Sequence, residues 1–378
     1  MHPIVIVGSG LAGYTLLKEI RKRDAAVPVT LVTADDAAFY SKPNLSNAFA
    51  TGRTAAALAS ASAEKMAADQ NAAVLTHTRV TAIDTQGRRI RTATAELEYS
   101  QLVLALGADP FAHGLAGDGA ADVLMVNDLA DYAAFRSAVD GRKRVTVLGG
   151  GLIGCEFAND LVHAGFAVDV VHLGDWPLER LLPVEAGQRL AGSLAALGVS
   201  WHFGRTGKSV ERMSHGYRVT LDKGESVEAD VVLSAIGLRP RTLLAQAAGI
   251  AVGRGIQTNA LLETSAAKVY AMGDCAEVEG LNLPYVQPLM VQARALAATL
   301  TGTPTPVVYA PMPVMVKTPA HPVAVLPPRI GAAGSWKVEC FDGGVCALHV
   351  DASGTLQGFA LTGSETGRRN ALAKELAA

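Results

Sequence analysis

Two glycine-rich runs are the parts of this sequence that most clearly indicate chemistry. They read Gly8-Ser9-Gly10-Leu11-Ala12-Gly13 and Gly149-Gly150-Gly151-Leu152-Ile153-Gly154. In a GxGxxG pattern the first glycine permits a tight turn, the second lets the backbone approach a pyrophosphate, and the third lets a helix pack closely on a strand. The phosphates then lie at the helix N-terminus, where free N–H groups and the helix dipole favour anions. The two runs therefore predict two dinucleotide sites.

Each run lies between a short apolar strand and an amphipathic helix. We expect strands over residues 3–7 and 144–148, followed by helices to about Arg23 and Ala164. A second apolar strand follows each helix, over residues 29–33 and 168–173. A glycine-rich turn without a ligand is the alternative for one run alone. Two runs, each opening a βαβ unit of about 30 residues, favour the doubly wound nucleotide-binding fold.

The rest of the chain completes this plan. We expect strands over residues 102–106, 231–236 and 268–272, and a helix that opens at Pro288 and continues to about Leu300. From Tyr309 onward the sequence predicts short alternating strands and a closing charged helix over residues 365–376, which is typical of a small α+β domain. The predicted fold class is α/β, with two doubly wound nucleotide-binding domains and a small C-terminal domain.

The composition excludes some function classes. The 378 residues carry a formal net charge of -2, which gives no support for binding nucleic acid or an anionic membrane surface. The apolar run over residues 4–17 contains three glycines and lacks a basic segment before it, and the run over residues 295–316 contains four prolines, so we expect no signal segment and no membrane insertion. The four cysteines form no CxxC pair, which favours a reducing cytoplasm. We expect a monomer.

In their order along the chain, these features resemble the FAD-dependent pyridine nucleotide-disulfide reductase superfamily. The matching parts are the two glycine runs with Glu156, Ala105-Leu106-Gly107, Ala235-Ile236-Gly237, and Thr264 through Gly273-Asp274. The resemblance implies that the first run holds FAD, that the second, inserted within the FAD domain, holds the nicotinamide cofactor, and that a C-terminal interface domain covers the flavin. The expected boundaries are 1–112 with 243–306, 113–242, and 307–378.

Shorter segments are more specific. Four of them look like the bacterial rubredoxin reductases, and flavorubredoxin reductases come next: Tyr40 to Ser46, Cys155 to Asp160, Gly237 to Thr242, and Pro313 to Pro319. This resemblance implies that NADH reduces FAD and that the electrons then pass to rubredoxin or a similar one-electron carrier.

Several FAD contacts are expected from the family. Ser9, Gly10, Leu11 and Ala12 would lie beside the pyrophosphate between Gly8 and Gly13. The family usually has an acidic residue for the adenosine ribose after the second strand, where this sequence has Thr33 and Ala34, so either these residues or Asp35 bind the ribose. Asp274 would accept a hydrogen bond from the ribitol chain, which is compatible with its being a helix N-cap.

A charged pair is expected at the flavin. In the family a lysine and a glutamate pair beside flavin N5, and the positions match Lys42 and Glu156. A cation there would stabilise the charge that arrives with the hydride. The simpler alternatives are a solvated loop lysine and an acid favoured by the first turn of a helix. The resemblance also implies that Val80 touches the adenine through its backbone, that the Val286 N–H faces the flavin pyrimidine ring, and that Lys317 closes the site.

The nicotinamide cofactor is expected at Gly149, Gly151 and Gly154. His172 occupies the usual acidic position after the second strand, and no arginine pair for a 2′-phosphate is present, which favours NADH over NADPH; Asp175 is an alternative ribose ligand. Family members that reduce disulfides carry a dithiol, which this sequence lacks. We therefore interpret Cys155, Cys275, Cys340 and Cys346 as packing residues and expect electrons to leave directly from the flavin.

Overall fold

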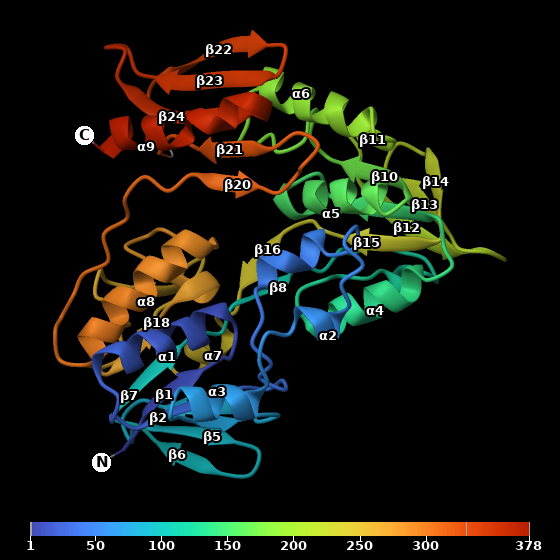
Figure 1. Ribbon diagram of the computed structural model, residues 1–378. Helices are drawn as coiled ribbons and strands as arrows, with labels where there is room; N and C mark the ends of the chain where they lie inside the picture. The colour runs from blue at the N-terminus through green and yellow to red at the C-terminus, as the bar shows by residue number, and fades with distance from the viewer. Residues whose placement is uncertain (1, 330, 378) are drawn as a thin grey trace. The chain divides into compact units, whose positions relative to one another are not determined.

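The computed structural model describes residues 2–329 and 331–377. These residues form two compact units, and the chain crosses between them several times (Figure 1). The first unit contains Met1–Lys42, Ala57–Asp109 and Leu238–Tyr309, and the second contains Pro43–Ala56, Pro110–Gly237 and Ala310–Ala378. The two glycine runs therefore belong to different units.

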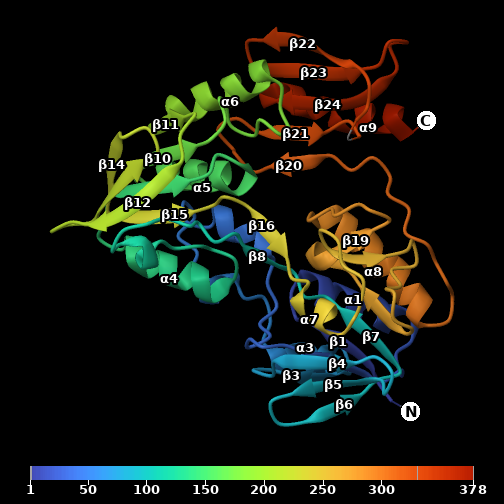
Figure 2. The same ribbon diagram turned by 180° about the vertical axis from the view of Figure 1, so that it is seen from behind.

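A five-stranded parallel sheet forms the centre of the first unit. Its strand order is β18 (Val269–Ala271), β7 (Gln101–Leu104), β1 (Ile4–Val7), β2 (Val29–Val32), β3 (Ala73–Leu75). Helix α1 (Leu11–Arg23) buries Leu16, Leu17 and Ile20 completely, and each such side chain contributes about 1.5–3 kcal/mol. Helix α8 (Val286–Leu300) packs against α1 (Figure 2). The core of this unit thus supports the start of α1, where the first glycine run lies.

Smaller elements complete the first unit. They are α3 (Ala63–Asp69), α7 (Leu243–Ala247), the 3-10 turn η3 (Gly273–Cys275), and the parallel pair β17 (Ile256–Thr258) and β19 (Ala276–Val278). At the crossings lie η1 (Lys42–Asn47), α2 (Ala55–Leu58), and the paired strands β8 (Ala108–Pro110) and β16 (Leu238–Pro240).

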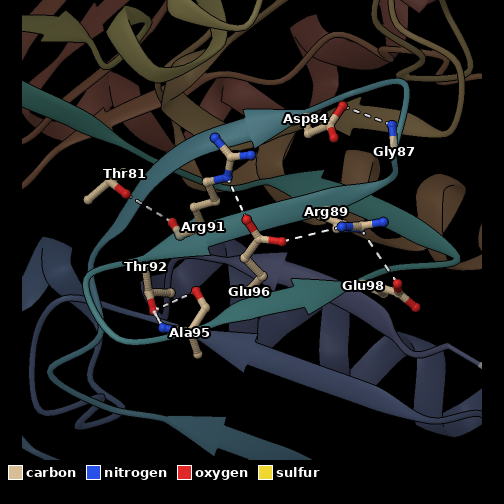
Figure 3. Close-up of polar contacts among 9 residues, drawn as sticks. All are labelled: Thr81, Asp84, Gly87, Arg89, Arg91, Thr92, Ala95, Glu96 and Glu98. Atoms are coloured by element: carbon tan, nitrogen blue, oxygen red, sulfur yellow. Dashed lines mark hydrogen bonds and ion pairs between the residues drawn. The ribbon is translucent and has the colours of Figure 1, made fainter.

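An antiparallel meander also belongs to the first unit. It consists of β4 (Val80–Asp84), β5 (Arg89–Thr92) and β6 (Glu96–Glu98). Figure 3 shows its polar contacts: Arg91 pairs with Glu96 at 2.7 Å, and the Asp84 carboxylate accepts the Gly87 N–H at 2.8 Å in the turn. Exposed ion pairs contribute at most about 1 kcal/mol, so the strand ladder and the turns fix this meander more than its charges do.

The second unit contains another parallel sheet. Its strand order is β11 (Val199–Phe203), β10 (Ala167–His172), β9 (Arg144–Leu148), β15 (Val231–Ser234). The helices of this part are α4 (Leu129–Val139), α5 (Leu152–His163) and α6 (Val184–Ala195), with a 3-10 turn η2 (Ala120–Asp122). An antiparallel sheet of β12 (Gly207–Arg212), β13 (Tyr217–Leu221) and β14 (Ser226–Ala229) follows.

The C-terminal part of the second unit is an antiparallel sheet with a helix. The strand order is β20 (Val314–Val316), β21 (Val323–Leu326), β24 (Leu356–Thr362), β23 (Gly344–Val350), β22 (Ser335–Phe341). The 3-10 turn η4 (Gly363–Arg368) leads into α9 (Arg369–Ala377), which packs on β24 and β21, while α6 contacts β23 and β24 (Figure 1). These sheets confirm the predicted fold class; the three-domain boundaries stay a prediction.

Three expectations about local structure were wrong. Helix α8 begins at Val286 rather than at Pro288, because the first turn of a helix has no intrahelical use for its N–H groups and tolerates proline beyond its first position. The C-terminal helix begins at Arg369, after a 3-10 turn. Cys340 is exposed on the edge strand β22, so it is no packing residue, whereas Cys155, Cys275 and Cys346 are buried as expected.

Candidate functional site

The first glycine run is shaped by close backbone contacts. Gly8 has φ 115°, and a Cβ there would collide with the Ala105 carbonyl oxygen. A Cβ on Gly13 would collide with the Gly8 carbonyl oxygen, so helix α1 can approach β1 this closely only with glycine at that position. A Cβ on Gly10, by contrast, would meet no atom of the described residues within 4 Å. The run thus leaves open space at the α1 N-terminus, where an anion is favoured.

A hydrogen-bond network supports this run from the end of β2. The buried Ser9 hydroxyl bonds to Thr33 Oγ1 at 3.0 Å and to Asp35 Oδ1 at 2.9 Å. The same Asp35 oxygen accepts the Thr33 hydroxyl at 2.7 Å and the Ala37 N–H at 3.0 Å. Asp35 and Ala34 are exposed, whereas Thr33 is buried. The carboxylate therefore lies beside the glycine run, at the position that sequence reasoning left open between Thr33, Ala34 and Asp35.

Asp274 lies next to the same run. A Cβ on its neighbour Gly273 would come within 2.9 Å of the Ala12 Cβ, and the Gly273 N–H donates to Gln292 Oε1 at 2.7 Å. Burial raises the pKa of the Asp274 carboxyl, and the Lys42 ammonium opposes that rise. The structure therefore brings Asp274, Lys42 and the glycine run together in the first unit.

Two further residues that were expected to contact FAD, Val286 and Val80, lie in the first unit. Val286 is the first residue of α8, is 40% exposed, and follows an N-cap residue, Tyr285, whose side chain makes no capping hydrogen bond. The helix has no acidic side chain in its first turn, so its N-terminal N–H groups are suited to an electron-rich ligand atom. Val80 is half-buried at the start of β4.

The second glycine run repeats the same backbone geometry. Gly149 has φ 107°, and a Cβ there would press on the Ala235 carbonyl oxygen, while a Cβ on Gly154 would collide with the Gly149 carbonyl oxygen. A Cβ on Gly151 would meet no atom within 4 Å among residues 2–329 and 331–377. The N-terminus of α5 is therefore open in the same way as that of α1.

His172 ends β10 and supports this run. Its Nδ1 accepts the Gly150 N–H at 3.1 Å, so its Nε2 carries the proton and donates to the Trp176 carbonyl at 3.1 Å. Burial lowers the pKa of the imidazole, which keeps the ring neutral at neutral pH. Both ring nitrogens are occupied, so His172 orders the loop and has no nitrogen left for a ribose.

Glu156 is the centre of a buried polar cluster in the second unit. Its side chain is 1% exposed, and Oε2 accepts the Lys317 ammonium at 2.7 Å and the Ser46 hydroxyl at 2.5 Å. Its other oxygen accepts the Lys317 backbone N–H at 2.8 Å. The Lys317 ammonium also donates to Ser46 Oγ at 3.1 Å and to the Pro43 carbonyl. Within this unit Glu156 therefore pairs with Lys317; the predicted pairing with Lys42, which belongs to the first unit, stays a prediction.

Sequence reasoning missed Ser46 and Asp160. Asp160 is 4% exposed and accepts the backbone N–H groups of Phe49 and Ala50 at 2.7 and 3.1 Å. It lies four residues after Glu156 on α5, so the two carboxylates share one helix face, and this spacing was the available signal.

The cysteines offer no reactive thiol at these sites, although the buried Cys155 thiol donates to the Gly150 carbonyl of the second run at 3.4 Å. All four are free, and burial raises the pKa of the Cys155 thiol and raises that of Cys275 to about 11. Such thiols are poor nucleophiles at neutral pH. Among the described residues, no helix is both long enough and apolar enough to cross a membrane.

Comparisons with known proteins give matches along almost the whole chain. Residues 2–298 match the family model described as pyridine nucleotide-disulphide oxidoreductase, and residues 306–376 match the rubredoxin binding C-terminal domain. A rubredoxin-NAD(+) reductase from Alcanivorax borkumensis is 51% identical, with 100% of this chain and 99% of that protein covered. A nitric oxide reductase FlRd-NAD(+) reductase from Aeromonas salmonicida is 40% identical, with 99% and 96% covered. Among solved structures, a ferredoxin reductase from Rhodopseudomonas palustris is 26% identical with a TM-score of 0.87, covering 96% of this chain and 91% of that one.

Proposed function

The chain belongs to the pyridine nucleotide-disulphide oxidoreductase family, and on this basis we propose that it is an NADH:rubredoxin oxidoreductase. The observation that carries the proposal is the full-length similarity, at 51% identity, to a rubredoxin-NAD(+) reductase. The match of residues 306–376 to a rubredoxin binding domain supports the same acceptor. When bound, FAD accepts a hydride as two electrons and passes electrons on singly to a carrier.

We assign FAD to the first unit. The fit of the site supports this, since the first glycine run leaves open space beside Gly10 and the N-terminus of α1 attracts a pyrophosphate. In this assignment Asp35 binds the adenosine ribose and Asp274 the ribitol chain. The N–H groups that open α8 at Val286 would face the flavin, and the Val80 backbone would face the adenine.

NADH is assigned to the second unit, at Gly149, Gly151 and Gly154. The neutral His172 holds this loop through Gly150 and presents no cation for a 2′-phosphate. This supports NADH over NADPH.

Lys42, Glu156 and Lys317 are the proposed charged residues of the reaction. All three protons of the Lys317 ammonium have acceptors within the second unit, so its charge is fixed in position there. On the family resemblance, we propose that this charge acts on the flavin. Glu156 keeps that cation paired where it is partly buried. In the first unit, Lys42 lies near enough to Asp274 to affect the pKa of its carboxyl. We propose that Lys42 stabilises the charge that the hydride brings.

The acceptor is tested by a steady-state panel of NADH and NADPH against purified rubredoxin and ferredoxin, at low and high salt. We expect NADH with rubredoxin to be fastest. We propose that basic residues of this chain steer an acidic rubredoxin, so added salt should slow their reaction. Rapid turnover with ferredoxin and none with rubredoxin would overturn the assignment of the acceptor.

A flavorubredoxin is the second candidate acceptor. The 40% identity to a nitric oxide reductase FlRd-NAD(+) reductase favours it, and adding flavorubredoxin to the panel decides between the two. We also propose a cytoplasmic location, which the four free thiols support.

A further inference from the structure

The segment Pro43–Ala56, here called the crossing segment, belongs to the second unit although it directly follows Lys42 of the first. Two carboxylates on one face of α5 bind it. Glu156 accepts the Ser46 hydroxyl, and Asp160 accepts the Phe49 and Ala50 amides. The helix that begins at the second glycine run is therefore the support of this segment.

Asp160 accepts two of the three hydrogen bonds that these carboxylates receive from the crossing segment. Burial raises the pKa of its carboxyl, and the two amide hydrogen bonds oppose that rise without cancelling it. Hydrogen bonds to an ionised acceptor are roughly twice as strong as neutral ones. No proposed step of the reaction uses Asp160, so its burial calls for another role.

Phe49 is the second anchor of the crossing segment. Its ring packs edge-on against Tyr132 and Phe135 of α4, with ring centroids 5.5 and 5.3 Å apart. The Arg136 guanidinium lies over the same ring at 4.7 Å, and the Tyr132 hydroxyl donates to the Arg53 carbonyl at 2.9 Å. These contacts leave Phe49 only 8% exposed.

The crossing segment in turn holds Lys317. Of the three acceptors of the Lys317 ammonium, two belong to this segment: the Pro43 carbonyl and Ser46 Oγ. The third is Glu156 Oε2. A shift of the segment would therefore move two of the three groups that place this charge.

We propose that Asp160 is a positioning residue: it fixes the crossing segment on α5 and so fixes the oxygens of Pro43 and Ser46 that hold the Lys317 ammonium. This inference rests on the proposed function for the role of Lys317 beside FAD. Within the second unit, it makes the helix that begins at the second glycine run set the position of the Lys317 ammonium.

The test compares Asp160→Asn and Asp160→Ala in the full chain. Hydrogen exchange at the Phe49 and Ala50 amides, measured by mass spectrometry with fragmentation, should be at least about tenfold faster in the alanine variant, because a bond to a charged acceptor is lost. The asparagine variant keeps one acceptor oxygen and should lie between alanine and wild type. In rapid mixing with NADH, the rate of flavin reduction should fall about fivefold to tenfold, with FAD content and NADH affinity unchanged, since misplacement by a fraction of an ångström costs rate.

Asp230→Asn is the matched control. Asp230 also accepts two backbone amides, those of Lys143 and Arg144, each at 2.9 Å and in the same unit. Its substitution should lower the melting temperature while leaving both the amide exchange of the crossing segment and the reduction rate unchanged. If the Asp160 variants do not fold, Phe49→Leu loosens the other anchor and should change both measurements in the same direction.

Two results would overturn the inference. One is unchanged exchange at Phe49 and Ala50 without the Asp160 carboxylate. The other is faster exchange with an unchanged rate of flavin reduction. Neither measurement uses rubredoxin, so both can be interpreted even if the acceptor is another protein. A chain that binds no FAD would contradict the proposed function, while amide exchange would still decide whether Asp160 anchors the segment.

Discussion

The two glycine runs have the same backbone geometry but different supports. In both, the first glycine has a positive φ and the third is packed against the carbonyl of the first. The loop of the first run is held by the Ser9 side chain, which bonds to Thr33 and Asp35. The loop of the second is held by a main-chain N–H, that of Gly150, which donates to His172.

The backbone that the two runs share suits the pyrophosphate of a cofactor, whereas the supports that differ suit recognition of the rest of the cofactor. Helix N-termini and glycine backbones suit any dinucleotide. The support at the end of the second strand differs in charge, since the first unit presents the Asp35 carboxylate and the second presents a neutral imidazole. The two sites can therefore hold different cofactors on the same local fold.

The largest expected effect comes from the third glycine of each run. Gly13→Ala and Gly154→Ala each add a methyl group against a backbone carbonyl, and overpacking of this kind costs about 1–3 kcal/mol. We expect Gly13→Ala to weaken FAD binding at least about tenfold. Gly154→Ala should keep its FAD and raise the KM for NADH by a similar factor. Visible flavin absorbance after purification, with steady-state kinetics, measures both; loss of FAD from Gly154→Ala alone would reverse the assignment of the two sites.

Lys42→Ala tests the charge near Asp274 in the first unit. FAD should stay bound, and the rate at which NADH reduces it should fall at least about tenfold, equivalent to ~1.4 kcal/mol in the barrier. Stopped-flow absorbance of the flavin gives this rate. An unchanged rate would remove Lys42 from the mechanism and leave Lys317 of the second unit as the proposed cation.

Substitution of the side chains that support the two runs, Asp35 and His172, should have a smaller effect. Asp35→Asn removes a charge but keeps an acceptor oxygen, so we expect the dissociation constant of FAD to rise about fivefold, as for a hydrogen bond of ~1 kcal/mol. His172→Gln should change the KM for NADH less than about threefold, because the ring makes two neutral hydrogen bonds to backbone groups. FAD titration measures the first effect and NADH kinetics the second. Equal losses of cofactor affinity in the two variants would contradict the interpretation that the charge of the support matters.

The smallest expected effect concerns pH. Burial lowers the pKa of His172, so the unfolded chain binds more protons than the folded one when the pH falls below the usual value for histidine. This group therefore stabilises the protein less as the pH falls from 7 toward 5. Burial also lowers the pKa of His321, which contributes in the same direction. His172→Gln should reduce, but not abolish, the fall in melting temperature over this range; an unchanged pH dependence would argue against the lowered pKa.

The sequence predicted the parts of this structure that depend on local pattern. Both glycine runs, the strands before them and the helices after them lie where their spacing indicated, because each is decided within a few residues. The partner of Glu156 within the second unit was not predictable in this way. Lys317 is 161 residues away and follows β20, so its contact with Glu156 depends on tertiary packing rather than on local pattern. Asp160 was missed because a buried aspartate reads in sequence as one more polar residue of a helix.

The pairing of β18 with β7 has a consequence for biosynthesis. Val269 pairs with Leu102, and the residues between them include the whole parallel sheet of the second unit. A chain emerging from the ribosome must therefore leave β7 with an open edge until that later sheet has been translated. Open strand edges are templates for aggregation, and domains fold as units during synthesis. We therefore expect the parallel sheet of the second unit to fold before β18 completes the sheet of the first unit. Newly made chains are most prone to aggregate before β18 has been translated.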